Sequence, residues 1–225
     1  MKKAAIIFLT IIIFVSMTKE SFADAGAGLV FYFLSPMVVP IGIGTSDEEK
    51  VYSIGIEPIF SYTDLSYELG NDEKAKWELM FPAVSLNAGI AAPVGDAIGM
   101  RIEAELAYGA FNGDELFKGD SGDYRVSNYK QFAAMLNFYY DIDLSAISLS
   151  TKLGLGMVRH IFDVNSVNTI EYKRFSKSLV AIAMGMELRY HINEHHSIEL
   201  DLTELMAFGG TDSSFRFALG YKYQF

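Results

Sequence analysis

The sequence contains no cysteine. Disulfide bonds, cysteine-ligated metals and attachment to a membrane through a lipidated N-terminal cysteine are therefore excluded. Basic residues are also few, because 18 Lys and Arg stand against 28 Asp and Glu, for a formal net charge of −10. A nucleic acid is not expected as a partner, since phosphate contacts need a basic surface. The chain is an acidic protein without disulfide bonds.

Long apolar runs are scarce as well. Lys2 and Lys3 precede an apolar run at residues 4–15, and small side chains precede a cleavage position between Ala23 and Asp24. This three-part pattern is typical of a secretory signal peptide. The run is shorter than the about 20 residues that a membrane-spanning helix needs. We therefore expect residues 1–23 to be a signal peptide, with an uncleaved anchor as the alternative.

No later segment is long and apolar enough to form a transmembrane helix. The best candidate, Gly28–Gly44, is interrupted by Pro36 and Pro40. Apolar residues nevertheless make up 51% of the chain. An exported, strongly apolar chain without a spanning helix is either a secreted globular protein or a β-barrel.

The chain contains repeated alternation of apolar with polar or small side chains. Because successive side chains of a β-strand point to opposite faces, this period-two pattern predicts strands with one apolar and one polar face. The clearest cases are Ile98–Ala110 and Phe215–Phe225. Eight segments follow the pattern: residues 51–62, 80–90, 98–110, 132–140, 147–157, 180–192, 198–202 and 215–225.

The connections between these segments distinguish a membrane barrel from a soluble β-sandwich, which would also alternate. Short turns at residues 93–97, 141–145 and 193–196 alternate with long polar segments at residues 68–76, 112–127 and 161–176. Short periplasmic turns and longer outer loops are typical of outer-membrane barrels. We therefore expect an all-β fold in residues 51–225: a closed, antiparallel, up-and-down transmembrane β-barrel of eight strands.

Residues 24–50 do not fit the eight-strand count. Gly28–Leu34 is continuously apolar and does not alternate. This N-terminal extension is interpreted as a plug or helix on the periplasmic side, or as an extra hairpin. The hairpin would give the alternative of ten strands.

Four patches of the sequence resemble one family of small outer-membrane proteins. They are Val51–Ser61, Arg101–Tyr108 followed by Phe111, Asn137–Ile142, and Gly220–Phe225. In this order they are similar to the opacity-type porins and major surface antigens of intracellular alphaproteobacteria. The resemblance implies an outer-membrane location and a role in surface antigenicity or adhesion. It also implies an assembly signal for the outer-membrane assembly machinery, formed by Tyr221, Tyr223 and Phe225.

The polar face of the predicted strands would point into the barrel. An interior of eight strands is just wide enough for side chains to fill, and a lone buried charge is very costly. The charges on this face therefore predict a salt-bridged core, with a narrow ion path as the alternative. They are Glu57, Arg101, Glu103, Glu105, Lys152, Glu187, Arg189, Glu199, Asp201, Arg216 and Lys222.

Catalytic candidates are confined to one cluster, His195-His196-Ser197, with Glu199 and Glu204 nearby. The cluster is similar to the His-x-Ser of outer-membrane acyl hydrolases. It occupies a predicted short turn, however, at the opposite end of the barrel from the outer leaflet. A lipid-cleaving site needs a nucleophile held by its base at the lipid interface. We therefore expect no catalytic residues, and no cofactor or metal site.

The sequence thus predicts a non-enzymatic outer-membrane surface protein with a structural, antigenic or adhesive role. The alternative is a small porin or channel, and a lipid-modifying enzyme is the third hypothesis. The expected partners are outer-membrane lipid, lipopolysaccharide-type headgroups and a ligand on a host surface. Lys173, Arg174 and Lys177 form the candidate basic patch for such a contact.

Overall fold

The computed structural model describes residues 50–70, 73–95, 97–119, 122–166, 172–208 and 213–225. The predicted signal peptide and almost all of the 24–50 extension lie outside these residues. Among the described residues, no helix is long and apolar enough to cross a membrane.

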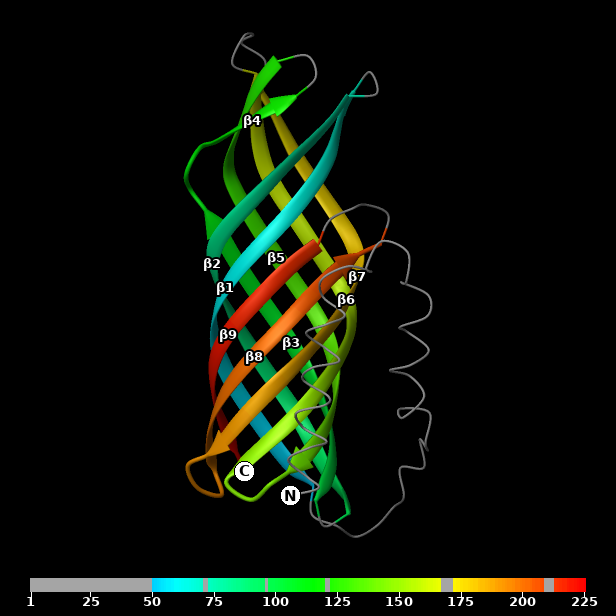
Figure 1. Ribbon diagram of the computed structural model, residues 1–225, viewed down its shortest axis with the longest axis vertical. Helices are drawn as coiled ribbons and strands as arrows, with labels where there is room; N and C mark the ends of the chain where they lie inside the picture. Colours follow the sequence, from blue (N-terminus) through cyan, green and yellow to red (C-terminus); the bar gives the residue numbers. More distant parts are fainter. Residues whose placement is uncertain (1–49, 71–72, 96, 120–121, 167–171, 209–212) are drawn as a thin grey trace, which may run out of the picture. The chain divides into compact units, whose positions relative to one another are not determined.

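Eight long antiparallel strands form a closed ring (Figure 1). A ninth, β4 (Glu115–Gly119), pairs only with the start of β5 and stands above the ring. The ring strands are β1 (Val51–Gly70), β2 (Glu73–Gly95), β3 (Ile98–Phe111), β5 (Gly122–Asp143), β6 (Ile147–Ser166), β7 (Tyr172–His191), β8 (His196–Ala207) and β9 (Ser213–Gln224).

The ring closes through two pairings between strands that are not consecutive in the chain, β1 with β9 and β3 with β5. β1 pairs with β9 from Ser53↔Gln224 to Asp64↔Ser213, and β3 pairs with β5 from Ile98↔Ile142 to Phe111↔Tyr129. β1 also pairs with β2, so both of its edges are occupied. An extra hairpin therefore has no free edge to join. The eight-strand prediction is confirmed, and the ten-strand alternative is wrong.

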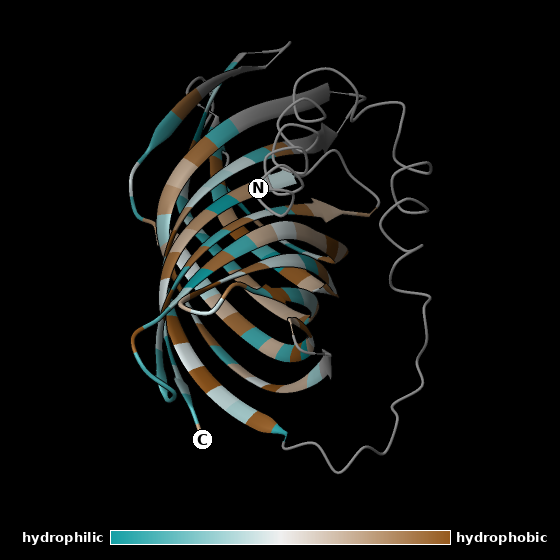
Figure 2. Ribbon diagram, turned by 60° about the horizontal axis from the view of Figure 1, so that its bottom comes forward, coloured by the Kyte–Doolittle hydropathy of each residue, from teal (hydrophilic) through white to brown (hydrophobic). Residues whose placement is uncertain are grey.

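The predicted alternation is present in the strands as alternating burial. Along β9, inward side chains are buried and outward side chains are exposed at almost every second residue. Figure 2 shows the same alternation as bands of opposite hydropathy across the strands. Each segment predicted as a strand lies within one of the eight ring strands, apart from the end residues Ile192 and Phe225.

The long segments predicted as loops are mostly extensions of the strands. Strand structure covers most of residues 68–76, 112–127 and 161–176, and β1 pairs with β2 up to Gly70↔Glu73. The alternation of apolar and polar side chains fails there because the outward face meets water instead of lipid. The backbone hydrogen bonds between the strands nevertheless continue. We call this end of the barrel the long-hairpin end (upper end in Figure 1).

The opposite end carries the predicted tight turns, and we call it the short-turn end. Ser145 has a positive φ of 80°, and its backbone N–H donates to Asp143 Oδ1 at 2.8 Å. Asn193 Oδ1 accepts from the backbone N–H groups of His195 and His196 at 2.9 and 3.0 Å. Short polar side chains favour such turns because they replace backbone hydrogen bonds locally. In bacterial barrels the short turns face the periplasm.

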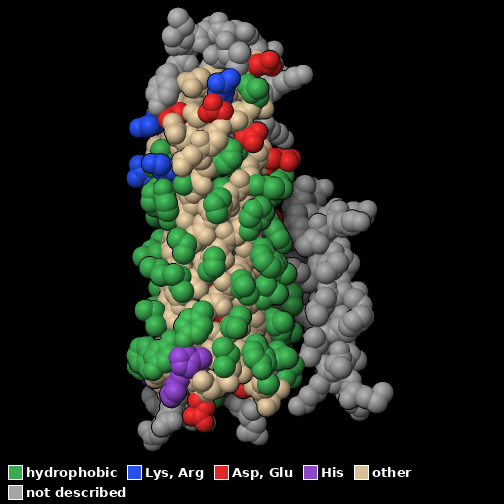
Figure 3. Space-filling view, turned by 90° about the vertical axis from the view of Figure 1, so that its left-hand side faces the viewer, with side chains coloured by type: hydrophobic (Ala, Val, Ile, Leu, Met, Phe, Trp, Pro, Cys, Tyr) green, Lys and Arg blue, Asp and Glu red, His purple; other side chains and the backbone are tan. Residues whose placement is uncertain are grey.

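The outward face of the ring is an apolar belt, with charged side chains above and below it (Figure 3). Exposed members include Phe60, Leu86, Leu106, Leu155 and Leu219, each more than half exposed. A soluble sandwich would bury this face, whereas here the charges are buried and the large apolar side chains are outside. This inside-out distribution is that of a barrel whose wall contacts lipid.

Candidate functional site: the barrel interior

All eleven charged residues assigned to the interior from the sequence are buried inside the barrel. None is more than 6% exposed. They come from β1, β3, β6, β7, β8 and β9 and lie toward the short-turn end. They are Glu57, Arg101, Glu103, Glu105, Lys152, Glu187, Arg189, Glu199, Asp201, Arg216 and Lys222.

Six of these groups form a closed ring of alternating charge across the lumen, which we call the charge ring. Each cation touches two carboxylates of the ring and each carboxylate touches two cations, so each ring charge has opposite charges on both sides. Such reciprocal pairing offsets the large cost of removing charges from water. In order, the pairs are Arg101–Glu187 at 2.6 Å, Glu187–Arg189 at 2.7 Å, Arg189–Glu199 at 2.5 Å, Glu199–Lys222 at 2.8 Å, Lys222–Glu103 at 2.6 Å, and Glu103–Arg101.

A second group of charges is centred on Glu105. Its two carboxylate oxygens accept from Arg216 at 3.0 Å and from Lys152 at 3.3 Å. Lys152 also reaches Asp201 at 3.2 Å, and the amide of Asn137 donates to Glu105 at 2.8 Å. The second group therefore spans the lumen from β3 to β6, β8 and β9.

Sequence reasoning missed two residues of this network because it assigned Asp141 to a turn and did not place Tyr139 in the interior. Asp141 lies on the inward face of β5, 3.5 Å from the Arg101 guanidinium. The Tyr139 ring lies under the same guanidinium, 3.7 Å from ring centroid to Cζ. Their spacing of two residues on one strand was the available signal, since such residues share a face.

Glu57 is the exception among the buried carboxylates. Its oxygens accept from Asn87 Nδ2 at 2.5 Å and from Ser85 Oγ at 3.1 Å, and no cation of the described residues lies within 4.0 Å. We therefore expect Glu57→Gln to change the free energy of unfolding by no more than about 1 kcal/mol. Glutamine keeps an acceptor for Asn87, and the Ser85 hydroxyl can accept instead of donating.

The matched comparison is Glu103→Gln, which removes a carboxylate shared by Arg101 and Lys222. Urea unfolding of both variants, followed by circular dichroism in the same detergent, measures the difference. Equal destabilisation by the two substitutions would contradict the view that Glu57, unlike Glu103, contributes no ion pair to the stability of the barrel.

Apolar side chains fill the interior between the charges and the long-hairpin end. The first layer is built mainly from small residues, which include Ala107, Ala133, Ala181, Ala183 and Ala218. Above it lies a cluster that we call the upper plug, in which each side chain is at most 9% exposed. The upper plug is Leu65, Leu79, Phe81, Val126, Tyr129, Phe162, Val164 and Phe175.

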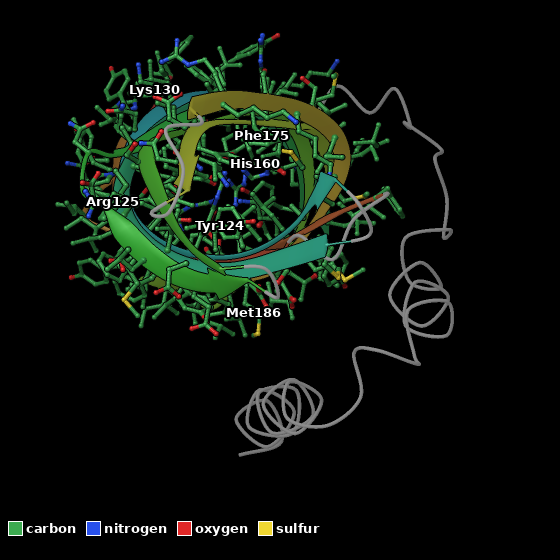
Figure 4. All side chains as sticks on the ribbon, turned by 90° about the horizontal axis from the view of Figure 1, so that it is seen from above. Tyr124, Arg125, Lys130, His160, Phe175 and Met186 are labelled. Atoms are coloured by element: carbon green, nitrogen blue, oxygen red, sulfur yellow. The ribbon has the colours of Figure 1, made fainter. Side chains whose placement is uncertain are left out.

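The charged groups and the apolar side chains together fill the described part of the barrel interior along its length. Seen from the long-hairpin end, His160 and Phe175 point into the barrel, whereas Lys130 and Met186 point away from it (Figure 4). The rings of Phe162 and Phe175 stack at 5.4 Å, and Phe162 also stacks on Tyr129 at 6.4 Å. The arrangement fits a solid core, in which an ion path would have to pass both the charge network and the upper plug.

The structure separates the serine and histidines of the sequence cluster. Ser197 is fully buried on the inward face of β8. His195 Nδ1 lies 3.1 Å from the Gln224 carbonyl oxygen, and His196 Nδ1 contacts the Tyr221 hydroxyl. Neither histidine is therefore placed as a base for Ser197.

A serine–histidine contact that sequence reasoning missed joins Ser148 and His191 across β6 and β7. Ser148 Oγ lies 2.6 Å from His191 Nε2. Ser148 is only 3% exposed, inside the barrel at the short-turn end. A hydroxyl in this position faces the interior, away from the lipid-facing wall of the barrel. Within the described residues, no cluster of side chains is suited to hold a metal ion.

The remaining sequence-predicted residues lie on the barrel wall. Tyr221 and Tyr223 point outward on β9, Phe225 follows the strand and is exposed, and the Tyr223 and Phe225 rings stack at 6.1 Å.

The basic patch lies on β7, not on a loop. Arg174 points outward and forms an ion pair with Asp163 at 2.8 Å. Lys173 and Lys177 occupy the opposite, inward register of the strand together with buried Phe175. The strand therefore divides the patch between its two faces.

Comparison with solved structures identifies the fold. Neisserial surface protein A is similar, with a TM-score of 0.54 and 12% identity over 77% of this chain and 97% of that one. A major outer membrane protein from Thermus thermophilus has a TM-score of 0.51 and 10% identity over 79% of this chain and 100% of that one. No protein-family profile and no curated protein sequence matches the chain. The fold, the apolar belt and the charged interior together identify a small, closed outer-membrane β-barrel of eight strands.

Proposed function

We propose that the protein is a non-enzymatic surface barrel whose interior is structural and whose long-hairpin end makes any contact outside the cell. The closed ring of alternating charge is the observation that carries this proposal. In a channel, permeating ions need free charges or carbonyl groups along a water-filled path. Here each of the five interior cations binds a carboxylate, and the upper plug lies between them and the long-hairpin end.

A small channel is the alternative, favoured by the number of charges in the lumen. A lipid-modifying enzyme has less support, because Ser197 is buried away from His195 and His196. A lipid A acyl-chain assay on Ser197→Ala tests the enzyme directly. We expect wild-type protein and variant to give the same lipid product pattern, whereas activity abolished by the substitution would contradict our proposal.

The surface role draws on the similarity of residues 51–61, 101–108, 137–142 and 220–225 to opacity-type porins and major surface antigens. In this proposal residues 1–23 direct export, and Tyr221, Tyr223 and Phe225 are recognised by the assembly machinery. The long hairpins then present Lys173 and Arg174, whose side chains are exposed, to an acidic surface ligand.

Binding of a sulfated polysaccharide to cells that display the protein tests the surface role. We expect binding that falls with salt, and its loss when Lys173, Arg174 and Lys177 are all replaced by Gln, because exposed charges act over only about 8 Å at physiological ionic strength. Arg125→Gln, an exposed cation on β5, is the matched control. Unchanged binding by the triple variant would remove the basic patch from the proposal.

A further inference from the structure

A groove of about 550 Å³ runs over the outer wall of the barrel across β2, β3, β5, β6 and β7. It lies on the lipid-facing side, outside the closed interior. Its walls are almost entirely apolar. The outward side chains that form them include Leu86, Leu106, Tyr108, Phe132, Ala134 and Met157.

The groove follows from the register of the strands. One row of paired residues crosses the wall as Leu106↔Ala134↔Met157. Ala134 is the smallest side chain of this row and leaves a gap between its two larger neighbours. The next row toward the long-hairpin end places Tyr108 and Phe132 above the gap. A depression one small side chain deep, bordered by large apolar groups, fits a hydrocarbon chain.

A cation lies in the row above the gap. Arg159 pairs with Phe132 in the β5–β6 register and lines the groove. Its Nε donates to Ser176 Oγ at 3.1 Å, which draws the guanidinium toward the long-hairpin end. Lys130 occupies the following row and points outward (Figure 4). Within the described part of the chain, neither side chain has a carboxylate at ion-pair distance, in contrast to Arg174 and the interior cations.

Arg159 and Lys130 occupy the first and second outward rows above Ala134, toward the long-hairpin end. In Figure 3, basic side chains lie directly above the belt on the upper part of the wall. At this level a membrane lipid changes from acyl chain to headgroup. Arginine matches phosphate geometry through paired N–H donors, and lysine adds a mobile point charge.

We propose that this groove binds a phosphate-bearing anionic lipid of the surrounding leaflet. One acyl chain lies over Ala134 between Leu106 and Met157, and the phosphate is bound by Arg159 and Lys130. The site is independent of the interior network and of the surface role proposed above, because all its side chains except Ala107, Ala133 and Val158 point away from the lumen.

Native mass spectrometry tests the site on protein extracted from bacterial outer membranes in a mild detergent. Phosphatidylglycerol and phosphatidylcholine with identical acyl chains are added in equal amounts. We expect one phosphatidylglycerol to be retained in preference to phosphatidylcholine. Arg159→Gln and Lys130→Gln should each weaken that retention by about five-fold, the effect of one cation near a membrane surface.

Two matched controls separate the headgroup from the groove. Arg125→Gln removes an exposed cation outside the groove and should leave retention unchanged. Ala134→Leu fills the gap and should weaken retention of both lipids, whereas Ala104→Leu adds the same volume to the outward face elsewhere and should not. Equal retention of the two lipids by the wild type, or charge variants that match it, would overturn the headgroup site. Equal effects of the two alanine variants would overturn the groove.

Discussion

Replacement of Arg101 by glutamine is expected to destabilise the barrel by about 3–5 kcal/mol, the cost of removing one partner from a buried ion pair. Arg101 contacts Glu103, Glu187 and Asp141, and its side chain is fully buried. Without the guanidinium, three carboxylates from β3, β5 and β7 face one another in a medium that solvates them poorly. Urea unfolding in detergent, followed by circular dichroism and by heat-dependent gel mobility, measures the loss.

The control for this prediction is Arg125→Gln. Arg125 pairs with Asp114 at 3.4 Å, but the two side chains are 47% and 52% exposed. Exposed pairs contribute about 0–1 kcal/mol, so the control should unfold close to the wild type. If Arg101→Gln unfolded at the same urea concentration as Arg125→Gln, the charge ring would have no structural role.

The second large effect is expected from Leu79→Ala in the upper plug. Leu79 is 1% exposed and packs inside the barrel with its neighbours of the plug. Leu→Ala substitutions in cores cost about 2–5 kcal/mol through lost burial and the cavity left behind. The loss should appear in the same urea titration. It should also speed proteolysis near the long-hairpin end, where the plug holds the extended strands together.

Leu116→Ala provides the matched comparison, because Leu116 is 64% exposed on β4. Surface substitutions usually change stability by no more than about 0.5 kcal/mol. Equal unfolding midpoints for the two leucine variants would mean that the upper plug packs too loosely to close the lumen.

The eight-stranded ring could be predicted from the sequence because the membrane imposes the alternation of apolar and polar side chains. Lipid on the outside and charges inside give segments such as Ile98–Ala110 an unbroken period of two. Above the belt this constraint ends, and residues such as Glu115–Gly119 pair as strands without the pattern. Hydropathy alone therefore underestimated the length of the strands.

The sequence predicted which charged side chains face the interior, but not which of them would pair with one another. The alternation along the strands placed Arg101 and Glu187 inside. Their contact, however, joins residues 86 positions apart and depends on the width and register of the barrel. Asp141 was missed because it follows apolar residues at an apparent turn. The lipid groove was missed for a similar reason: Ala134 becomes a gap only when β3 and β6 place Leu106 and Met157 beside it.

The most direct test of the closed interior is the conductance of the folded protein in a planar bilayer, after a heat-dependent gel shift has shown that the barrel is folded. The reciprocal pairing of the charge ring and the packing of the upper plug predict no reproducible conductance steps. Stable steps of constant size from the folded wild type would contradict the account and support the small channel instead.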